Sequence, residues 1–304
     1  MREQPRPRRP EGFALIRLLL GGICNTDLEL QRGYYNFRGT PGHEFVGEVV
    51  AADSPDLIGE RVVGEINLGC GACDWCTEGL GRHCPRRTVL GIVKHPGAFR
   101  ELLTLPERNL HRVPRGIPTE QAVFVEPLAA ACEILDQVRI PAGARVAVLG
   151  DGKLGLLVGQ VLKAHGAEVH QYGRHKDKLR IAAQAGIDAR MARKLPRAEY
   201  SWVVDATGSS DGLRQAVQMT KPRGTVVMKS TVHGAVPLDS APVIVNEITL
   251  VGSRCGRFEP ALRLLRTKQV SVARLISEIL PLKDAPRAFQ RAATPGVLKV
   301  LLQA

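Results

Sequence analysis

Short apolar runs separated by glycine and proline make up the first 120 residues of the chain. Runs of this length between turn residues are typical of β-strands, and four stand out, at residues 14–20, 45–51, 61–66 and 99–105. Their spacing and the turn residues between them predict an irregular, mostly β domain.

A helical pattern begins at residue 126, where apolar residues recur at helical spacing up to residue 137. Pro127 is compatible with this helix because it lies in the first turn, whereas Pro141 cannot continue it. From Ala144 onward, short apolar strands alternate with helices. The expected strands are 146–149, 168–172, 202–205, 224–229 and 248–251, and the expected helices are 154–165, 176–185, 210–219 and 260–267. This alternation predicts a doubly wound parallel sheet.

These patterns divide the chain into two predicted domains of the α/β class. Residues 1–122 form the mostly β domain together with residues 271–304, whose helix and strand (297–302) we expect to return to it. Residues 123–270 form the parallel-sheet domain. A chain of 304 residues is long enough for two domains of ordinary size.

The composition is that of a globular protein. Hydrophobic residues make up 44% of the chain and charged residues 24%, which excludes disordered, collagen-like and coiled-coil proteins. No apolar stretch reaches the ~20 residues that a membrane span needs. The basic, proline-rich start lacks the apolar segment of a secretory signal. We therefore predict a cytoplasmic protein with no membrane partner.

The net charge of +12 favours anionic partners, either nucleic acid or a cofactor that carries phosphate. The basic residues are spread along the chain, and no basic helix or nucleic-acid-binding motif stands out. Aromatic residues, at 4%, offer little surface for stacking bases. We therefore expect a phosphate-bearing cofactor and no nucleic acid, and a nucleic-acid-binding zinc protein is the rival interpretation.

Four of the seven cysteines lie within fifteen residues, at Cys70, Cys73, Cys76 and Cys84. Such a cluster is more typical of a metal site in a reducing compartment than of a secreted disulfide framework. Four thiolates can close tetrahedrally around a structural zinc ion, and four neighbouring glycines allow the tight loop. An iron–sulfur cluster is the alternative, because it also takes four cysteines. We predict a zinc lobe over about residues 69–85.

A dinucleotide-binding fingerprint follows the strand at 146–149 and opens the next helix. Its residues are Gly150, Asp151, Gly152, Lys153, Leu154 and Gly155. In this context the first glycine makes a tight turn, the second lets a pyrophosphate approach the backbone, and the third packs helix against strand. The helix N-terminus then meets the phosphate charge.

The end of the second strand of the parallel sheet bears on the choice of cofactor. An acid there would bind the ribose 2′-hydroxyl of NAD, but the sequence has Gly173, followed by Arg174, His175 and Lys176. A guanidinium can bind a 2′-phosphate through two hydrogen bonds, and an acid would repel it. We therefore predict NADP(H) in preference to NAD(H); a solvated basic loop is the alternative.

Four scattered residues could form a second metal site: Cys24, His43, Glu44 and Glu126. Each has an ordinary structural explanation, as a small buried residue, a core histidine or a helix N-terminal carboxylate. Sulfur, imidazole and carboxylate together, however, suit zinc with an open coordination position.

The order of these motifs resembles that of the zinc-dependent medium-chain dehydrogenase/reductase family. Cys24-Asn25-Thr26-Asp27, Gly42-His43-Glu44, the four-cysteine lobe and the Gly150 fingerprint are similar in layout to alcohol, polyol and threonine dehydrogenases. The resemblance covers nearly the whole chain. It implies a GroES-like catalytic domain that carries two zinc ions, and a Rossmann domain inserted before the C-terminal return. Only 23 residues precede Cys24, so we expect the family's first strand and turn to be largely missing.

The resemblance also implies roles for individual residues. Cys24 and His43 would bind the catalytic zinc, with Glu44 binding it or lying behind it and Glu126 binding it directly or through water. Thr26 would start a proton relay and Asp27 would orient the His43 imidazole. Cofactor contacts are expected from Thr207, Lys229 and Ser230, because these residues follow strands of the parallel sheet.

The function implied is reversible hydride transfer between an alcohol, of the secondary or polyol type, and NADP+. The alternatives are an NAD-dependent polyol or threonine-type dehydrogenase, a zinc-independent reductase of the same superfamily, and a cofactor-binding member without turnover. The family's usual assembly implies a homodimer or homotetramer, with edge strands of the parallel sheet near residues 245–252 as the pairing surface.

Overall fold

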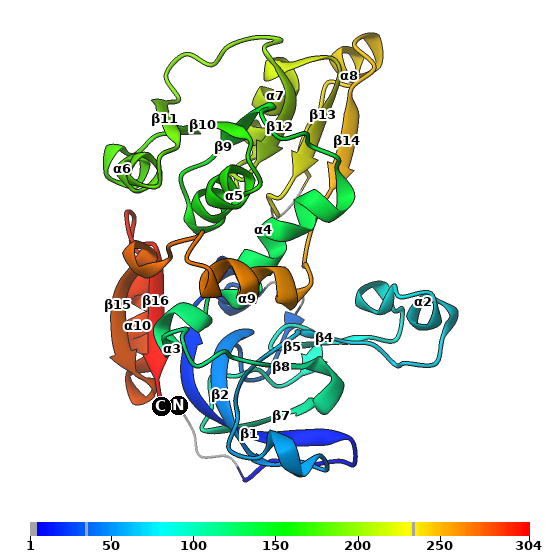
Figure 1. Cartoon of the computed structure of the whole chain (residues 1–304), viewed down its shortest axis with the longest axis vertical. Helices are drawn as coiled ribbons and strands as arrows, with labels where there is room; N and C mark the ends of the chain where they lie inside the picture. Colours follow the sequence, from blue (N-terminus) through cyan, green and yellow to red (C-terminus); the bar gives the residue numbers. More distant parts are fainter. Residues whose placement is uncertain (1–4, 34–35, 233–234) are drawn as a thin grey trace. The chain divides into compact units, whose positions relative to one another are not determined.

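The chain folds into two compact units in the computed structural model (Figure 1). The structure describes residues 5–33, 36–232 and 235–304. The first unit comprises Met1–Glu126, Phe258–Arg266 and Leu275–Ala304, and the second comprises Pro127–Arg257 and Thr267–Arg274. The first therefore takes one helix, Phe258–Arg266, out of the range predicted for the parallel-sheet domain. Among the described residues, no helix is long and apolar enough to span a membrane.

The first unit is built on a seven-stranded sheet in the order β15-β16-β1-β2-β3-β8, with β7 paired to β1. Its larger strands are β1 (Phe13–Gly22), β2 (Glu44–Ala51), β3 (Arg61–Gly64), β7 (Leu102–Pro106), β8 (Leu110–Arg112), β15 (Ile276–Pro281) and β16 (Lys299–Gln303). The expected return of the C-terminus is confirmed, because β16 pairs antiparallel with β1 in the register Leu20↔Gln303.

Short elements complete this unit. They are α1 (Asn25–Gln31), β4 (Asn67–Leu68), α2 (Asp74–Thr77), β5 (Thr88–Leu90), β6 (Lys94–His95), α3 (Thr119–Ala122), α9 (Phe258–Arg266) and α10 (Ala285–Ala292), with 3₁₀ turns at Pro55–Leu57, Gly81–His83, Glu107–Asn109 and Leu282–Asp284. The helix α9 contacts α3, and its Phe258 ring lies 5.4 Å from the ring of His111. Phe258, Leu262 and Leu265 are buried, so this apolar face gives the helix its place in the first unit.

The second unit is a doubly wound parallel sheet in the order β11-β10-β9-β12-β13-β14. Its strands are β9 (Arg145–Leu149), β10 (Glu168–Gly173), β11 (Asp188–Met191), β12 (Tyr200–Asp205), β13 (Thr220–Met228) and β14 (Thr249–Gly252). The helices are α4 (Val125–Gln137), which begins at the end of the first unit, α5 (Lys153–Ala164), α6 (Lys176–Gln184), α7 (Ser210–Met219) and α8 (Ala241–Val245), followed by a 3₁₀ turn at Ala273–Leu275.

Every neighbouring pair in this second sheet is parallel, as the sequence predicts. Chain order reverses direction between β9 and β12, and ligands of such sheets bind at the carboxyl ends of the strands around this reversal. The core here is continuous and apolar, with Val203, Val226 and Ala147 fully buried. A rigid sheet thus holds the loops that follow β9, β10, β12 and β13.

Candidate functional site

Three of the four residues predicted for the catalytic metal lie together in the first unit. The ligand atoms of Cys24, His43 and Glu44 all lie within 4.8 Å of one another. Cys24 is the N-cap of α1, with one residue between it and the end of β1, and Glu44 is the first residue of β2. The pairing of β1 with β2 sets Gly22 opposite Glu44, so sheet register brings these two segments together.

Asp27 ties this cluster to the backbone. Its fully buried carboxylate accepts hydrogen bonds from the N–H groups of Cys24 at 2.8 Å and Gly42 at 3.0 Å. His43 Nδ1 lies 3.3 Å from the same carboxylate, without the alignment of a hydrogen bond. Burial lowers the pKa of His43, but the charges of Asp27 and Cys24 outweigh burial and hold that pKa well above 6.5. Asp27 is therefore placed to orient the imidazole.

Two glycines make room for the cluster. A Cβ atom at Gly22 would lie 2.7 Å from Glu44 Oε2, and one at Gly42 would lie 2.6 Å from the Phe99 ring. Gly42 also has a φ of +103°, a conformation that residues with side chains rarely adopt. The turn before His43 therefore depends on glycine for both space and backbone geometry.

The residues present fit a zinc ion. A thiol, an imidazole and a carboxylate form the kind of mixed donor set that zinc accepts in catalytic sites. The three donors are close enough to share one ion. Cys24, His43 and Glu44 are thus the described residues that could hold the metal here.

Glu126 and Thr26 stay predictions. Glu126 lies half-buried in the first turn of α4 and is not part of the three-donor group. The Thr26 hydroxyl lies in the first turn of α1, 3.9 Å from Cys24 Sγ.

Lys299 is a member of this site that the sequence analysis did not find. Its ammonium contacts Glu44 Oε2 and lies 5.7 Å from the centre of the Phe124 ring. Both side chains of the ion pair are at most 2% exposed. Burial lowers the pKa of Lys299, but the Glu44 carboxylate outweighs it and raises that pKa above its ordinary value. The one available signal was a single lysine at the start of an apolar C-terminal strand.

Replacing Lys299 with methionine should lower the free energy of unfolding by about 3–5 kcal/mol, because it removes the cation that faces the buried Glu44 carboxylate. Urea unfolding followed by circular dichroism measures the loss. Lys283→Met, at an exposed lysine, is the control and should change stability by less than about 0.5 kcal/mol. Adding Glu44→Gln to Lys299→Met should recover part of the loss; equal stability of the Lys299 variant and the wild type would contradict this account.

The predicted zinc lobe brings its four cysteines together. Their sulfur atoms form one group, with separations of 3.6 Å for Cys73–Cys76, 3.7 Å for Cys73–Cys84 and 4.0 Å for Cys70–Cys76. Sulfurs at the corners of a tetrahedron with ~2.3 Å bonds to zinc lie roughly 3.8 Å apart. These separations therefore fit one metal ion and are far too long for disulfides.

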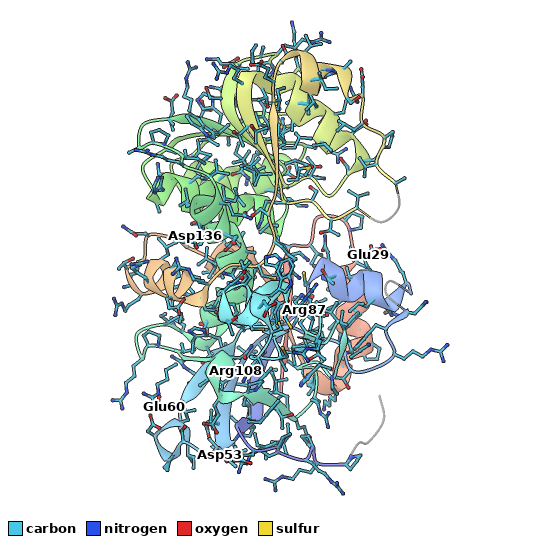
Figure 2. All side chains as sticks on the ribbon, turned by 90° about the vertical axis from the view of Figure 1, so that its right-hand side faces the viewer. Glu29, Asp53, Glu60, Arg87, Arg108 and Asp136 are labelled. Carbon is cyan, nitrogen blue, oxygen red and sulfur yellow. The ribbon has the colours of Figure 1, made fainter. Side chains whose placement is uncertain are left out.

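Arginines surround this lobe (Figure 2). Arg86 donates a hydrogen bond to Cys70 Sγ at 3.2 Å, and Arg108 and Arg87, both labelled in the figure, donate to the carbonyls of Gly69 and Cys84. Four thiolates around a divalent ion carry two excess negative charges, which nearby guanidinium groups offset. The pKa of Cys70 falls to about 6, mainly through a backbone hydrogen bond, which favours its thiolate.

The glycine-rich loop after β9 has the geometry that its motif predicts. Gly150 has a φ of +118°, and a Cβ there would lie 2.4 Å from the carbonyl oxygen of Ala206. A Cβ at Gly155 would lie 2.3 Å from the carbonyl oxygen of Gly150, whereas the space beside Gly152 is open. The helix α5 begins at Lys153, so its free N–H groups follow this open position. The loop can therefore receive a pyrophosphate.

The other predicted cofactor residues lie at the ends of neighbouring strands. Arg174 and His175 are exposed after β10. Thr207 donates to Asp205 after β12, and the Ser230 hydroxyl accepts from the N–H of Gly208. Lys229 already has partners within the protein. Its ammonium donates hydrogen bonds to the carbonyl oxygen of Ala130 at 2.6 Å, the hydroxyl of Ser253 at 3.1 Å and the carbonyl oxygen of Arg254 at 2.7 Å. A cofactor contact through Lys229 would have to replace one of these bonds.

Comparisons with known proteins agree with both units. Residues 10–115 match the alcohol dehydrogenase GroES-like domain, and residues 154–267 match the zinc-binding dehydrogenase family. The chain is 31% identical to 2-dehydro-3-deoxy-L-galactonate 5-dehydrogenase of Pseudoalteromonas atlantica, over 95% of this chain and 91% of the relative. It is 30% identical to D-altritol 5-dehydrogenase of Agrobacterium fabrum, over 98% and 94%.

A solved structure gives the same result. The chain aligns with a protein of Sinorhizobium meliloti 1021 that was crystallised with NADP, with a TM-score of 0.88, 28% identity, and coverage of 100% of this chain and 95% of the other. The predicted pair of domains, GroES-like and Rossmann, is therefore confirmed. The named relatives oxidise CH–OH groups, which makes this chain an alcohol-type oxidoreductase that uses NAD(P). The chain belongs to the zinc-type medium-chain dehydrogenase/reductase family.

Proposed function

We propose that this chain is a zinc-dependent dehydrogenase that transfers a hydride between a secondary or polyol-type alcohol and NADP+. The observation that carries the proposal is the group of metal-ligand atoms from Cys24, His43 and Glu44, held in the first unit by the pairing of β1 with β2. When bound there, zinc supplies a Lewis acid that lowers the pKa of an alcohol and polarises a carbonyl.

The side chains around the metal site have separate tasks in this proposal. Asp27 orients the His43 imidazole, since it is itself fixed by two backbone N–H groups. Lys299 neutralises and positions Glu44 from behind. Thr26 relays the proton of the alcohol outward, because its hydroxyl, two residues after Cys24 at the start of α1, can accept that proton while it gives up its own. Glu126 remains the proposed fourth ligand, directly or through water.

A polyol or a hydroxy-acid is the substrate class that the comparisons favour. The two relatives named above act on a sugar acid and on altritol, both of which carry more than one secondary hydroxyl. Carboxylate and water around zinc make a harder shell than cysteine alone, which suits substrates that chelate through two oxygens. A panel of polyols, sugar acids and simple alcohols, assayed with both cofactors, tests this. Faster turnover of simple primary alcohols than of any polyol would contradict it.

The proposed cofactor is NADP(H). After β10 the strand ends in Gly173 instead of an acid, and the guanidinium of the exposed Arg174 has no hydrogen-bond or ion-pair partner in the described part of the chain. A free guanidinium is well suited to a 2′-phosphate. NADPH should therefore bind at least about tenfold more tightly than NADH, which corresponds to ~1.4 kcal/mol. Fluorescence titration of both cofactors at one ionic strength measures the ratio; equal affinities would contradict the preference.

Assembly as a homodimer or homotetramer is also proposed. Ile244 and Val245 in α8 are 71% and 79% exposed, beside β14, the last strand in the sheet order. Exposed apolar side chains next to a sheet edge are suited to pairing between copies. Light scattering of the purified protein would give the number of subunits.

A further inference from the structure

Asp151, the second residue of the glycine-rich loop, points its side chain at the end of β10. Its Oδ2 accepts hydrogen bonds from the backbone N–H groups of Arg174 and His175, each at 2.7 Å. The His175 ring nitrogen Nδ1 lies 3.0 Å from the same oxygen and 3.1 Å from Oδ1. The carboxylate thus joins the two loops between which the adenosine ribose of a dinucleotide binds in this fold.

The position of this carboxylate explains the glycine that ends β10. A Cβ atom at Gly173 would lie 2.5 Å from Asp151 Oδ2 and 2.6 Å from Asp151 Cβ. The side chain of an acid at position 173 would therefore occupy the space that Asp151 already fills. An acid at position 173 therefore fits only if the Asp151 side chain moves.

The Asp151 carboxylate is hydrogen-bonded to other groups of the protein. The residue is 7% exposed, and the backbone N–H groups of Arg174 and His175 and the His175 ring nitrogen surround its carboxylate. Burial raises the pKa of Asp151, but the hydrogen bonds and the charge of His175 outweigh burial, so the pKa lies below its ordinary value. An ionised carboxylate engaged in this way holds the Arg174–His175 turn in one conformation.

We propose that Asp151 is a positioning residue that sets the cofactor preference of this site. In NAD-type sites the strand-end acid binds the ribose 2′-hydroxyl; here the carboxylate has moved into the glycine-rich loop, where it excludes such an acid and fixes Arg174 for a 2′-phosphate. The inference rests on the proposed NADP(H) function and adds the residue that controls it.

Affinities of NADPH and NADH for a set of variants test the proposal. Asp151→Ala should weaken NADPH binding at least about tenfold, the effect of losing an ordered guanidinium–phosphate contact. NADH affinity should change less than about threefold, because NADH has no 2′-phosphate for Arg174 to bind. Asp151→Asn keeps an acceptor for the two N–H groups, so its ratio of affinities should stay within about threefold of the wild type.

The steric part of the proposal has its own test. Gly173→Ala should weaken NADPH binding in the wild-type background, because the methyl group meets the Asp151 carboxylate. In the Asp151→Ala background the same change should cause little further loss, which is the coupling expected of two groups that share one space. The double variant Asp151→Ala, Gly173→Asp moves the carboxylate to the strand end and should shift the ratio toward NADH at least about tenfold relative to Asp151→Ala. Gly173→Asp alone would combine the charge effect with the steric clash.

A matched control and a stability check complete the design. Asp177→Ala removes an exposed carboxylate two residues after His175, and its ratio should stay within about twofold of the wild type. Circular dichroism melts show whether each variant is folded, and Asp151→Ser, which also removes the carboxylate, replaces Asp151→Ala if that variant does not fold. If Asp151→Ala weakens both cofactors equally, or changes their ratio by less than about threefold, the role of Asp151 is overturned. A wild-type protein that prefers NADH would instead refute the proposed cofactor, and the change on Asp151→Ala would still be measurable.

Discussion

Alcohol oxidation should be abolished when Cys24 is replaced by serine or His43 by alanine, and the zinc content of the purified protein should fall from about two ions per chain to about one. These residues supply two of the three clustered ligand atoms in the first unit. Loss of the Lewis acid removes several kcal/mol of charge stabilisation, which corresponds to a fall in turnover on the order of 10³-fold or more. Metal analysis together with steady-state rates measures both effects.

Cys255→Ser provides the matched control for this experiment, because Cys255 lies outside both metal-ligand groups of the described residues. It should keep both zinc ions and full activity. Survival of turnover in the Cys24 or His43 variant, with one zinc ion lost, would show that the reaction does not use this site. A wild-type protein that holds only one zinc ion and lacks turnover would support the alternative of a cofactor-binding member without activity.

Loss of a lobe cysteine should have a different signature. Cys84→Ala removes a fully buried sulfur from the four-cysteine group, so one zinc ion should again be lost while Cys24 and His43 remain in place. Metal binding and folding of such a lobe are coupled, with apparent binding energies of about 10–16 kcal/mol in zinc-finger peptides. We expect local unfolding of residues 69–85, seen as rapid proteolysis in this segment and as a melting temperature several degrees lower.

Cys255→Ala, the same change outside the lobe, should leave proteolysis and the melting temperature nearly unchanged. Metal analysis also separates zinc from the iron–sulfur alternative, because a cluster would give iron, sulfide and a visible absorption band. An intact, protease-resistant lobe in Cys84→Ala would contradict a structural role of the metal. The hydrogen bond from Arg86 to Cys70 Sγ would then have a role other than offsetting the charge of a metal-bound thiolate.

Local patterns were sufficient for most of the secondary structure. The helix at 210–219 matches α7, and the predicted strands of the parallel sheet lie within two residues of β9, β10, β12 and β14 at each end. β13 starts four residues earlier than expected, at Thr220. Several short strands were not predicted. Among them, β11 (Asp188–Met191) and β15 (Ile276–Pro281) have residues that are mostly half-buried or exposed and show no continuous apolar run.

The placement of α9 shows where local patterns stop. Its apolar face is evident in the sequence, but the surface that this face covers is not. The prediction therefore grouped α9 with the parallel-sheet domain, whereas the structure groups it with the first unit. The sheet of the first unit raises the same difficulty, since β16 pairs with β1 from the opposite end of the chain. Pairings of this kind depend on long-range packing, which a local window does not contain.

By itself the sequence determined the two kinds of domain, the four-cysteine lobe and the dinucleotide-binding loop, because each depends on residues that are close together along the chain and on backbone geometry that glycine alone permits. Tertiary structure decided the rest. It joined Lys299 to Glu44, 255 positions away, and it placed Asp151 against Gly173 and the turn that follows. Buried charges must find partners wherever the fold brings the segments together, so these pairings became visible only when the sheets were assembled.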